Sequence, residues 1–120
     1  MPTNAELAPC PSSPNCVSSL ATDSGHQIAP LAFRGDPAQA MRRLRAVIEA
    51  MPRTRIVEFS DRALRAQFTS FLFRFVDDVD CVVDAPAGVI QIRSASRVGY
   101  SDLGANRKRV EAIRRAFAAS

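Results

Sequence analysis

The residues best suited to chemistry in this sequence lie between Arg93 and Arg107, where a predicted strand ends and a predicted helix begins. This stretch combines arginines, serines and one tyrosine with the free backbone amides that a helix start exposes. Such amides attract anions, and the forked guanidinium of arginine pairs with carboxylates and phosphates. We therefore predict a polar site that binds a small molecule or a protein. Its residues in this stretch are Arg93, Arg97, Tyr100, Asp102, Asn106 and Arg107.

Two acids on the preceding predicted strand, Asp77 and Asp78, complete the candidate site. Because side chains alternate along a strand, Asp77 faces the same side as Val79, towards the expected core. A core-facing carboxylate needs hydrogen-bond donors or a cation. The expected strand pairing places Ser96 opposite Asp77, with Arg97 just beyond it. We expect either a structural network between Asp77 and Arg97 or a ligand site.

The same residues allow an alternative, a small enzyme that uses Asp77, Asp78, Arg97 and Tyr100. Catalysis by such acids requires a nucleophile or metal ligands beside them. The sequence contains one histidine, His26, and no nucleophile-elbow motif with which it could form a catalytic triad. The acids also lack the glycine and the terminal glutamate of a calcium-binding loop. We therefore favour a non-catalytic ligand-binding or interaction protein, with no catalytic residue, metal ion or cofactor expected.

Two cysteines near the N-terminus, Cys10 and Cys16, enclose five residues that include two prolines. This spacing suits a small disulfide loop, because the prolines pre-bend the chain, and it also suits reduced structural thiols. A zinc site would need further ligands, and thioredoxin-like chemistry needs only two intervening residues. The third cysteine, Cys81, falls at a core position and is expected to act as a small buried hydrophobic residue.

The composition narrows the classes of partner. In 120 residues, 16 lysines and arginines stand against 12 acids, which gives a net charge of +4. Nucleic-acid binding by such a surface usually adds stacking aromatics, but Trp is absent and Tyr100 is the only tyrosine. Nucleic acid is therefore not an expected partner. No apolar run reaches the ~18 residues of a membrane-spanning helix, so no transmembrane segment is expected.

The first 35 residues hold five of the eight prolines. Proline and serine favour turns over regular pairing, so residues 1–35 are expected to form an irregular segment that packs on the domain. No basic and apolar leader is visible at the start, which indicates a cytoplasmic protein, or one of the cell envelope if a leader was removed. The ligand, the oligomeric state and the compartment stay open.

Residues 36–120 are expected to form a single α+β domain. Apolar residues recur at helical spacing after Asp36, a predicted N-cap, and Pro52 ends that pattern. A second helix is predicted from Asp102, which is also expected to be its N-cap. Alternating apolar residues between the helices predict four strands, over residues 55–59, 63–69, 71–84 and 89–96.

Strand parity predicts how these strands pair. Opposite residues in a hairpin share a face, so a four-residue turn at 85–88 pairs Val83 with Ile90 and Asp80 with Arg93. The other junctions also fit antiparallel connections, and the four strands form a meander. Helices covering one of its faces complete a two-layer sandwich. The residues expected on the core face near the start of the third strand are Phe71, Phe73 and Phe75.

Three motifs in the chain resemble a known family. They are CPSSPNCVS at 10–18, FVDDV at 75–79 and RSASRVGYSDLGANR at 93–107. Together they are similar to an uncharacterised family, domain of unknown function 1499, found in bacteria and in photosynthetic eukaryotes. The resemblance extends from Cys10 to about Ile113 and implies a small stand-alone domain. It implies no established activity.

Overall fold

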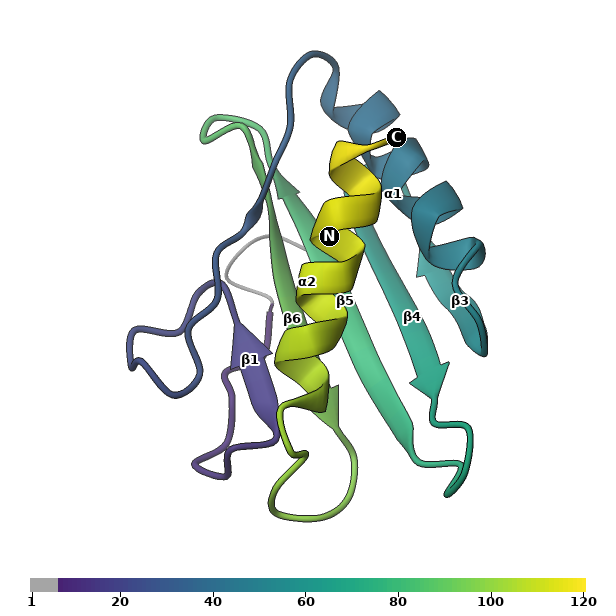
Figure 1. Cartoon of the computed structure of the whole chain (residues 1–120). Coiled ribbons are helices and arrows are strands. Elements are labelled where there is room, and N and C mark those ends of the chain that lie inside the picture. Colours follow the sequence, from purple (N-terminus) through teal and green to yellow (C-terminus); the bar gives the residue numbers. More distant parts are fainter. Residues whose placement is uncertain (1–6) are drawn as a thin grey trace.

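A computed structural model describes residues 7–120 of the chain (Figure 1). Two helices and one antiparallel sheet make up this range, so the α+β class expected from the sequence is confirmed. Neither helix in residues 7–120 is long and apolar enough to cross a membrane. The elements are β1 (Cys16–Ser18), β2 (Leu31–Ala32), α1 (Pro37–Glu49), β3 (Thr54–Phe59), β4 (Ala63–Thr69), β5 (Val76–Asp84), β6 (Val89–Ser96) and α2 (Ala105–Ala118).

Strands β3 to β6 form the expected meander. Each pairs antiparallel with the next along the chain. Val83 lies opposite Ile90 and Asp80 lies opposite Arg93, as the parity of the two strands predicts. The alternation of side chains along each strand therefore determines which residues face each side of the sheet.

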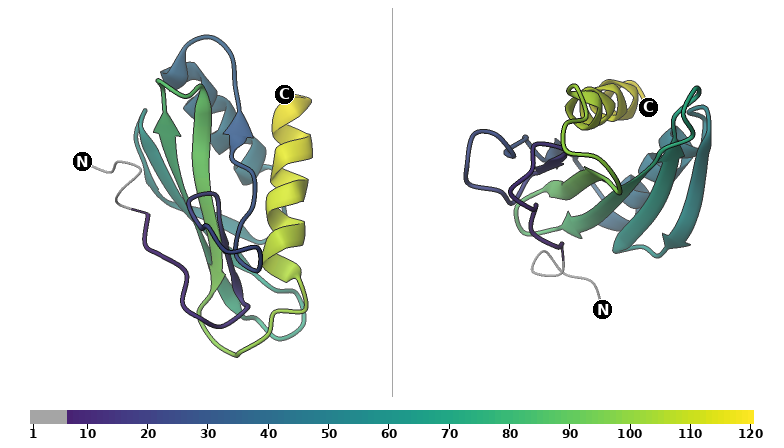
Figure 2. Two further views of the ribbon diagram at one scale, coloured as in Figure 1. Left: turned by 90° about the vertical axis from the view of Figure 1, so that its left-hand side faces the viewer. Right: turned by 90° about the horizontal axis from the view of Figure 1, so that it is seen from below.

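Both helices cover the same face of the sheet, which we call the covered face; the other is the open face. Leu44 of α1 and Ile113 of α2 belong to one buried cluster with sheet residues such as Val79 and Ile92. Figure 2 shows α2 and the first described residues on opposite sides of the sheet. The layers are thus sheet and helices, with one sheet face left free of helices.

The N-terminal segment is more regular than expected. Its strands β1 and β2 both pair antiparallel with β6, through Val17 opposite Ser94 and Leu31 opposite Ile90. The sheet therefore has six strands, in the order β1-β6-β5-β4-β3, with β2 also on β6. These strands span only three and two residues. Residues 1–6 of the segment lie outside the described range.

The third expected strand, 71–84, begins only at Val76. The preceding residues turn instead: Ser70 donates its backbone N–H to the Phe75 carbonyl and accepts the Phe75 N–H at its hydroxyl. Arg74 adopts a left-handed backbone with φ 59°, which a strand does not accommodate. The core position expected for three aromatic residues is therefore wrong, since they are exposed: Phe71, Phe73 and Phe75.

The two helix starts differ. Asp36 caps α1 as expected, because its carboxylate accepts the Gln39 N–H at 3.1 Å. The expected N-cap of α2 is wrong: α2 begins at Ala105, and its N-cap is Gly104, with φ 80°. A glycine tolerates this left-handed conformation without steric cost. It lets the chain turn into the helix two residues later than predicted.

Candidate functional site

The residues of the predicted site lie in three places rather than one. The polar stretch after β6 alternates between the two faces of the sheet before it enters α2, so neighbours in sequence are separated by the sheet itself. The covered face holds Asp77, Asp102 and Asn106, the open face holds Asp78, Arg93 and Arg97, and Tyr100 and Arg107 lie outside both groups.

On the covered face, Asp77 forms an ion pair with Arg109 of α2 at 2.8 Å. The two side chains are only 11% and 15% exposed, and the Arg109 guanidinium also lies 5.0 Å from the centre of the Phe68 ring. The expected pair of Asp77 with Arg97 is therefore wrong. Ser96 pairs with Asp77 and shares its face, so alternation turns Arg97 to the open face.

Asn106, at the start of α2, is the centre of this buried network. It is fully buried, and both polar atoms of its amide are used. Its oxygen accepts two hydrogen bonds, and the two N–H groups of its nitrogen are shared among three acceptors, so the side chain has no free capacity for a ligand. Its partners are Ser94 Oγ at 2.6 Å, Arg109 Nη1 at 2.9 Å, Asn15 O at 3.2 Å, Ser96 Oγ at 2.9 Å and Asp102 Oδ2 at 2.8 Å.

Asp102 still serves the helix start, although it is not the N-cap. Its carboxylate accepts the Gly104 N–H at 2.7 Å and the Asn106 N–H at 3.1 Å. Partial burial by itself raises the pKa of this carboxyl, but the hydrogen bonds from Asn106 and Gly104 outweigh burial and lower the pKa below its ordinary value. Asp102 is therefore an ionised, fully engaged part of the network.

The two remaining predicted residues of the C-terminal stretch have separate roles. Arg107 donates to the carbonyls of Gln27 and Gly25, at 2.9 and 3.4 Å, and so fastens the N-terminal segment to α2. Arg114, which the sequence did not single out, donates in the same way to two further carbonyls of that segment. Tyr100 lies in the loop before α2 and is 72% exposed.

On the open face, arginines and acids from neighbouring strands form ion pairs. Arg97 holds Asp78 through two hydrogen bonds, at 2.8 and 2.9 Å. Arg65 of β4, which the sequence analysis missed as a site residue, reaches Asp80 at 2.6 Å. Its position on the outer side of β4 was the signal available, because Arg65 pairs with Asp80 in the sheet. These pairs neutralise most of the charge on this face.

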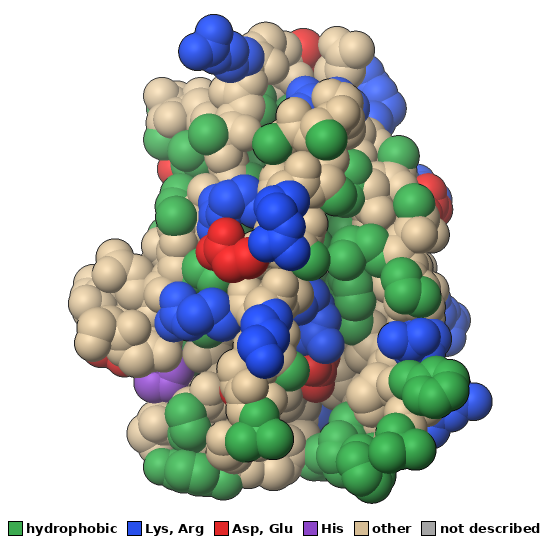
Figure 3. Space-filling view, in the orientation of Figure 1, with side chains coloured by type: hydrophobic (Ala, Val, Ile, Leu, Met, Phe, Trp, Pro, Cys, Tyr) green, Lys and Arg blue, Asp and Glu red, His purple; other side chains and the backbone are tan. Residues whose placement is uncertain are grey.

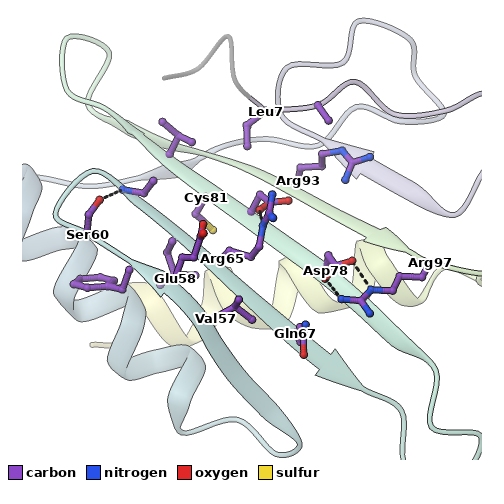
Figure 4. Close-up of a pocket in the computed structure, with 16 residues that line it drawn as sticks. Leu7, Val57, Glu58, Ser60, Arg65, Gln67, Asp78, Cys81, Arg93 and Arg97 are labelled. Atoms are coloured by element: carbon purple, nitrogen blue, oxygen red, sulfur yellow. Dashed lines mark hydrogen bonds and ion pairs between the residues drawn. The ribbon is translucent and has the colours of Figure 1, made fainter. Parts of the chain in front are cut away.

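A groove of about 830 Å³ runs along the open face (Figure 4). Its walls combine apolar side chains with the ion-paired residues above, and Leu7 closes one side. Pocket volumes of roughly 300–1,000 Å³ are typical of small-molecule sites. The lining residues used below are Leu7, Val57, Glu58, Arg65, Gln67 and Arg93.

Arg93 differs from the other arginines of the groove. Its register partner Asp80 is held by Arg65, so Arg93 forms no ion pair within residues 7–120. Its Nη2 donates to the Pro9 carbonyl at 3.3 Å, while its Nε is buried without a hydrogen-bond partner there. A buried donor without an acceptor is costly. Arg93 is therefore the arginine of the groove lining whose charge has no carboxylate partner within residues 7–120.

A disulfide holds the edge of this groove. Cys10 and Cys16 are bonded, with an S–S distance of 2.03 Å, which confirms the disulfide candidate. Cys16 belongs to β1, so the bond ties the preceding residues to the sheet, and Leu7 is buried against it. The Pro9 carbonyl is thereby held within reach of Arg93.

The remaining candidates for chemistry are engaged elsewhere. His26 contacts Asp23 through Nδ1 and the Ser13 carbonyl through Nε2, and the hydrogen bond to Ser13, followed by that to Asp23, raises its pKa. Burial strongly raises the pKa of the Cys81 thiol, so it stays protonated. Across residues 7–120, no three His, Cys, Asp or Glu side chains form a group that could hold a metal ion.

Comparison with protein families identifies the chain. A family model described as a protein of unknown function, DUF1499, matches residues 6–117. The match covers nearly the whole chain, so the chain belongs to this family, as its three motifs suggest. No curated protein matches the chain, and no solved structure does.

Proposed function

We propose that this member of the DUF1499 family is a non-catalytic binding protein whose open-face groove receives a small organic anion. The observation that carries the proposal is Arg93, a half-buried cation that lines the groove and forms no ion pair within residues 7–120. A carboxylate or phosphate group matches the guanidinium fork of such an arginine.

The charges of the groove favour Arg93 as the anchor. Arg97 is occupied by Asp78, and Arg65 is occupied by Asp80 with Glu58 adding to the negative field around it. An anion approaching Arg65 or Arg97 would compete with these carboxylates, whereas Arg93 forms no ion pair with any residue of 7–120. Apolar wall residues such as Val57 and Leu7 suit the hydrocarbon part of a ligand.

The spatial separation of the polar residues favours binding over catalysis. The alternative, an enzyme using Asp77, Asp78, Arg97 and Tyr100, needs these groups around one reacting atom. Asp77 and Asp78 point to opposite faces of the sheet, and Tyr100 lies in the loop beyond it. Of the four, only Asp78 and Arg97 touch, and each neutralises the other.

Calorimetric titration with octyl phosphate, octanoate and inorganic phosphate tests the proposal. We expect saturable binding of the two amphiphilic anions, and the Arg93→Gln substitution should weaken it by about tenfold or more, because a hydrogen bond to a charged group contributes roughly 1.5–3 kcal/mol. Arg55→Gln is the matched control: Arg55 is an exposed arginine of β3 outside the groove lining. Absence of saturable binding, or equal affinity in Arg93→Gln, would contradict the proposal.

A further inference from the structure

Two loops leave the sheet at the same end. One joins β4 to β5 through residues 70–75, and the other joins β6 to α2 through residues 97–104. Asp77, at the start of β5, pairs with Ser96, at the end of β6, so both loops extend beyond the same edge. We call this region the loop end. Figure 3 shows hydrophobic side chains gathered there, at the bottom of the view.

The loop end carries most of the exposed large hydrophobic side chains. Of the nine such residues in the described range, seven belong to these two loops, and each is more than half exposed. A concentration of this kind in water usually marks a surface that contacts a membrane or a protein. The seven are Phe71, Leu72, Phe73, Phe75, Val98, Tyr100 and Leu103.

A hydrogen-bonded frame holds both loops in place. Ser70 closes the first loop through two hydrogen bonds to Phe75. The Asn15 amide donates to the carbonyls of Val98 and Gly99, at 3.4 and 2.7 Å, and so holds the second loop. The backbone is thus satisfied internally while the apolar side chains project outward. Exposing these apolar side chains to water is unfavourable, and covering them with an apolar partner would lower the free energy.

The charges at the loop end are cationic. Arg53 lies over the Phe71 ring, 5.5 Å from its centre, and Arg74 is part of the first loop. Within residues 7–120, neither arginine forms an ion pair. The nearby acids are engaged, Asp78 by Arg97 and Asp102 by backbone and side-chain amides. The apolar tips therefore have a positive rim.

We propose that the loop end docks on the surface of an anionic lipid bilayer. The apolar side chains of both loops enter the interface, and Arg53 and Arg74 contact the lipid phosphates, as basic residues do at anionic membranes. A bilayer fits better than a protein because these side chains project from two separate tips and do not line the open-face groove. A fluid lipid bilayer accommodates two protruding loops without a surface of complementary shape. The proposal is independent of ligand binding in the groove.

Vesicle co-sedimentation of the full chain tests this docking. We expect binding to vesicles of phosphatidylcholine with phosphatidylglycerol, little binding to phosphatidylcholine alone, and weaker binding at high salt. Tyr100 is the only tyrosine and Trp is absent, so intrinsic fluorescence reports directly on the second loop. Anionic vesicles should protect it from quenching by iodide, and this readout needs no variant.

The double substitution Phe71→Ser with Phe73→Ser should reduce vesicle binding by about a hundredfold, since each ring that leaves water contributes roughly a factor of ten. Arg53→Gln with Arg74→Gln should reduce it severalfold. Leu20→Ser, an exposed leucine away from the loop end, is the matched control. Failure to bind anionic vesicles, or equal binding to neutral ones, would overturn the proposal. So would a dimer in solution that the phenylalanine substitutions dissociate, because the loop end would then contact a second copy.

Discussion

The buried network of the covered face and the groove of the open face are built from the same stretch of sequence, yet they treat polar groups in opposite ways. Under α2, the Asn106 amide contacts five hydrogen-bonding partners and Asp77 is paired with Arg109. Across the sheet, Arg93 leaves its Nε without an acceptor in the described range. Satisfied buried groups define a single packing arrangement, whereas a buried donor without an acceptor leaves a free-energy cost.

The alternation of β6 creates this difference. Ser94 and Ser96 point into the network, while Arg93 lies on the groove side and Arg97 continues that alternation beyond the strand. A site predicted from residue types alone therefore combines residues of the buried network with residues of the open-face groove. The buried network should therefore contribute to stability, and we propose that the open face binds a ligand; the following substitutions test this division.

The largest expected effect comes from removing the centre of the network. Asn106→Ala removes the acceptor of the buried Ser94 O–H and a donor to Ser96 Oγ, and it leaves the Asn15 carbonyl with only the Ser96 N–H. At 1–3 kcal/mol for an unsatisfied buried group, we expect a loss of about 4 kcal/mol in the free energy of unfolding. Gln67→Ala, an amide on the open face, should change it by about 0.5 kcal/mol or less. Urea denaturation measures both, and similar losses would invalidate the division into two faces.

A double-mutant cycle on Asp77 should give the next largest effect. Asp77→Asn leaves Arg109 buried without its countercharge, and we expect a loss of about 2–3 kcal/mol. The cycle with Arg109→Gln should show clear coupling, and the cycle with Arg97→Gln should show almost none. Arg97→Gln alone breaks an exposed pair with Asp78 and should cost about 1 kcal/mol or less. Coupling of Asp77 to Arg97 would reverse the assignment of partners.

Loss of the disulfide should affect the groove and stability together. Replacing Cys10 and Cys16 by serine frees the small loop, and chain entropy predicts a loss of about 2 kcal/mol in the free energy of unfolding. The Pro9 carbonyl is then no longer held at Arg93, so octyl phosphate binding should change in the same variant. Reductant should destabilise the native protein and leave the serine variant unaffected. If reductant destabilises both equally, the effect does not come from this bond.

The smallest expected effect is a pH dependence at His26. Its raised pKa means that its stabilising contacts are fully present below about pH 6.5 and are lost as pH rises through the higher folded value. Stability measured by denaturant should therefore decline as the pH rises above about 6.5 and level off above the raised pKa of His26. The pKa of Asp23 is lowered by the hydrogen bond from His26, so this carboxylate stays ionised throughout. A His26→Gln variant with the same decline would assign it to another group.

Local chemistry was enough to predict much of the fold. Asp36 followed by Pro37 identifies the start of α1, and the parity of Val83 and Ile90 sets the register of the central hairpin. The pairing of β1 with β6 was not predictable in this way, because it joins Cys16 to Ala95 across most of the chain. Only two or three residues of each N-terminal strand pair, too few for an alternating pattern.

The aromatic loop shows where pattern reading fails. Phe71, Phe73 and Phe75 alternate as strand residues do, and the sequence offers no competing turn signal such as glycine or proline. The left-handed backbone at Arg74 keeps β5 from beginning before this residue. An arginine in the sequence does not predict such a conformation. The apolar type of these phenylalanines therefore does not report a core position, because all three side chains are exposed.

For the site, residue types identified Asp77 and Asn106 but not their shared partner. Arg109 follows Asn106 by three positions, beside the buried Val110 and Ile113 of α2. Helix periodicity therefore places it on the inner face, and that signal could have identified the pair. Arg93 could not be separated from Arg97 by type, because their difference depends on which carboxylates the neighbouring strands supply.

The most direct test compares the two faces in one NMR titration with octyl phosphate. The side-chain Nε–H of Arg93 and the side-chain amide of Asn106 give separate signals, one for each region. We predict that the Arg93 signal shifts saturably while the Asn106 signal stays in place. Shifts at Asn106 and Arg109 without a shift at Arg93 would contradict the account, because the ligand would then enter the network rather than the groove.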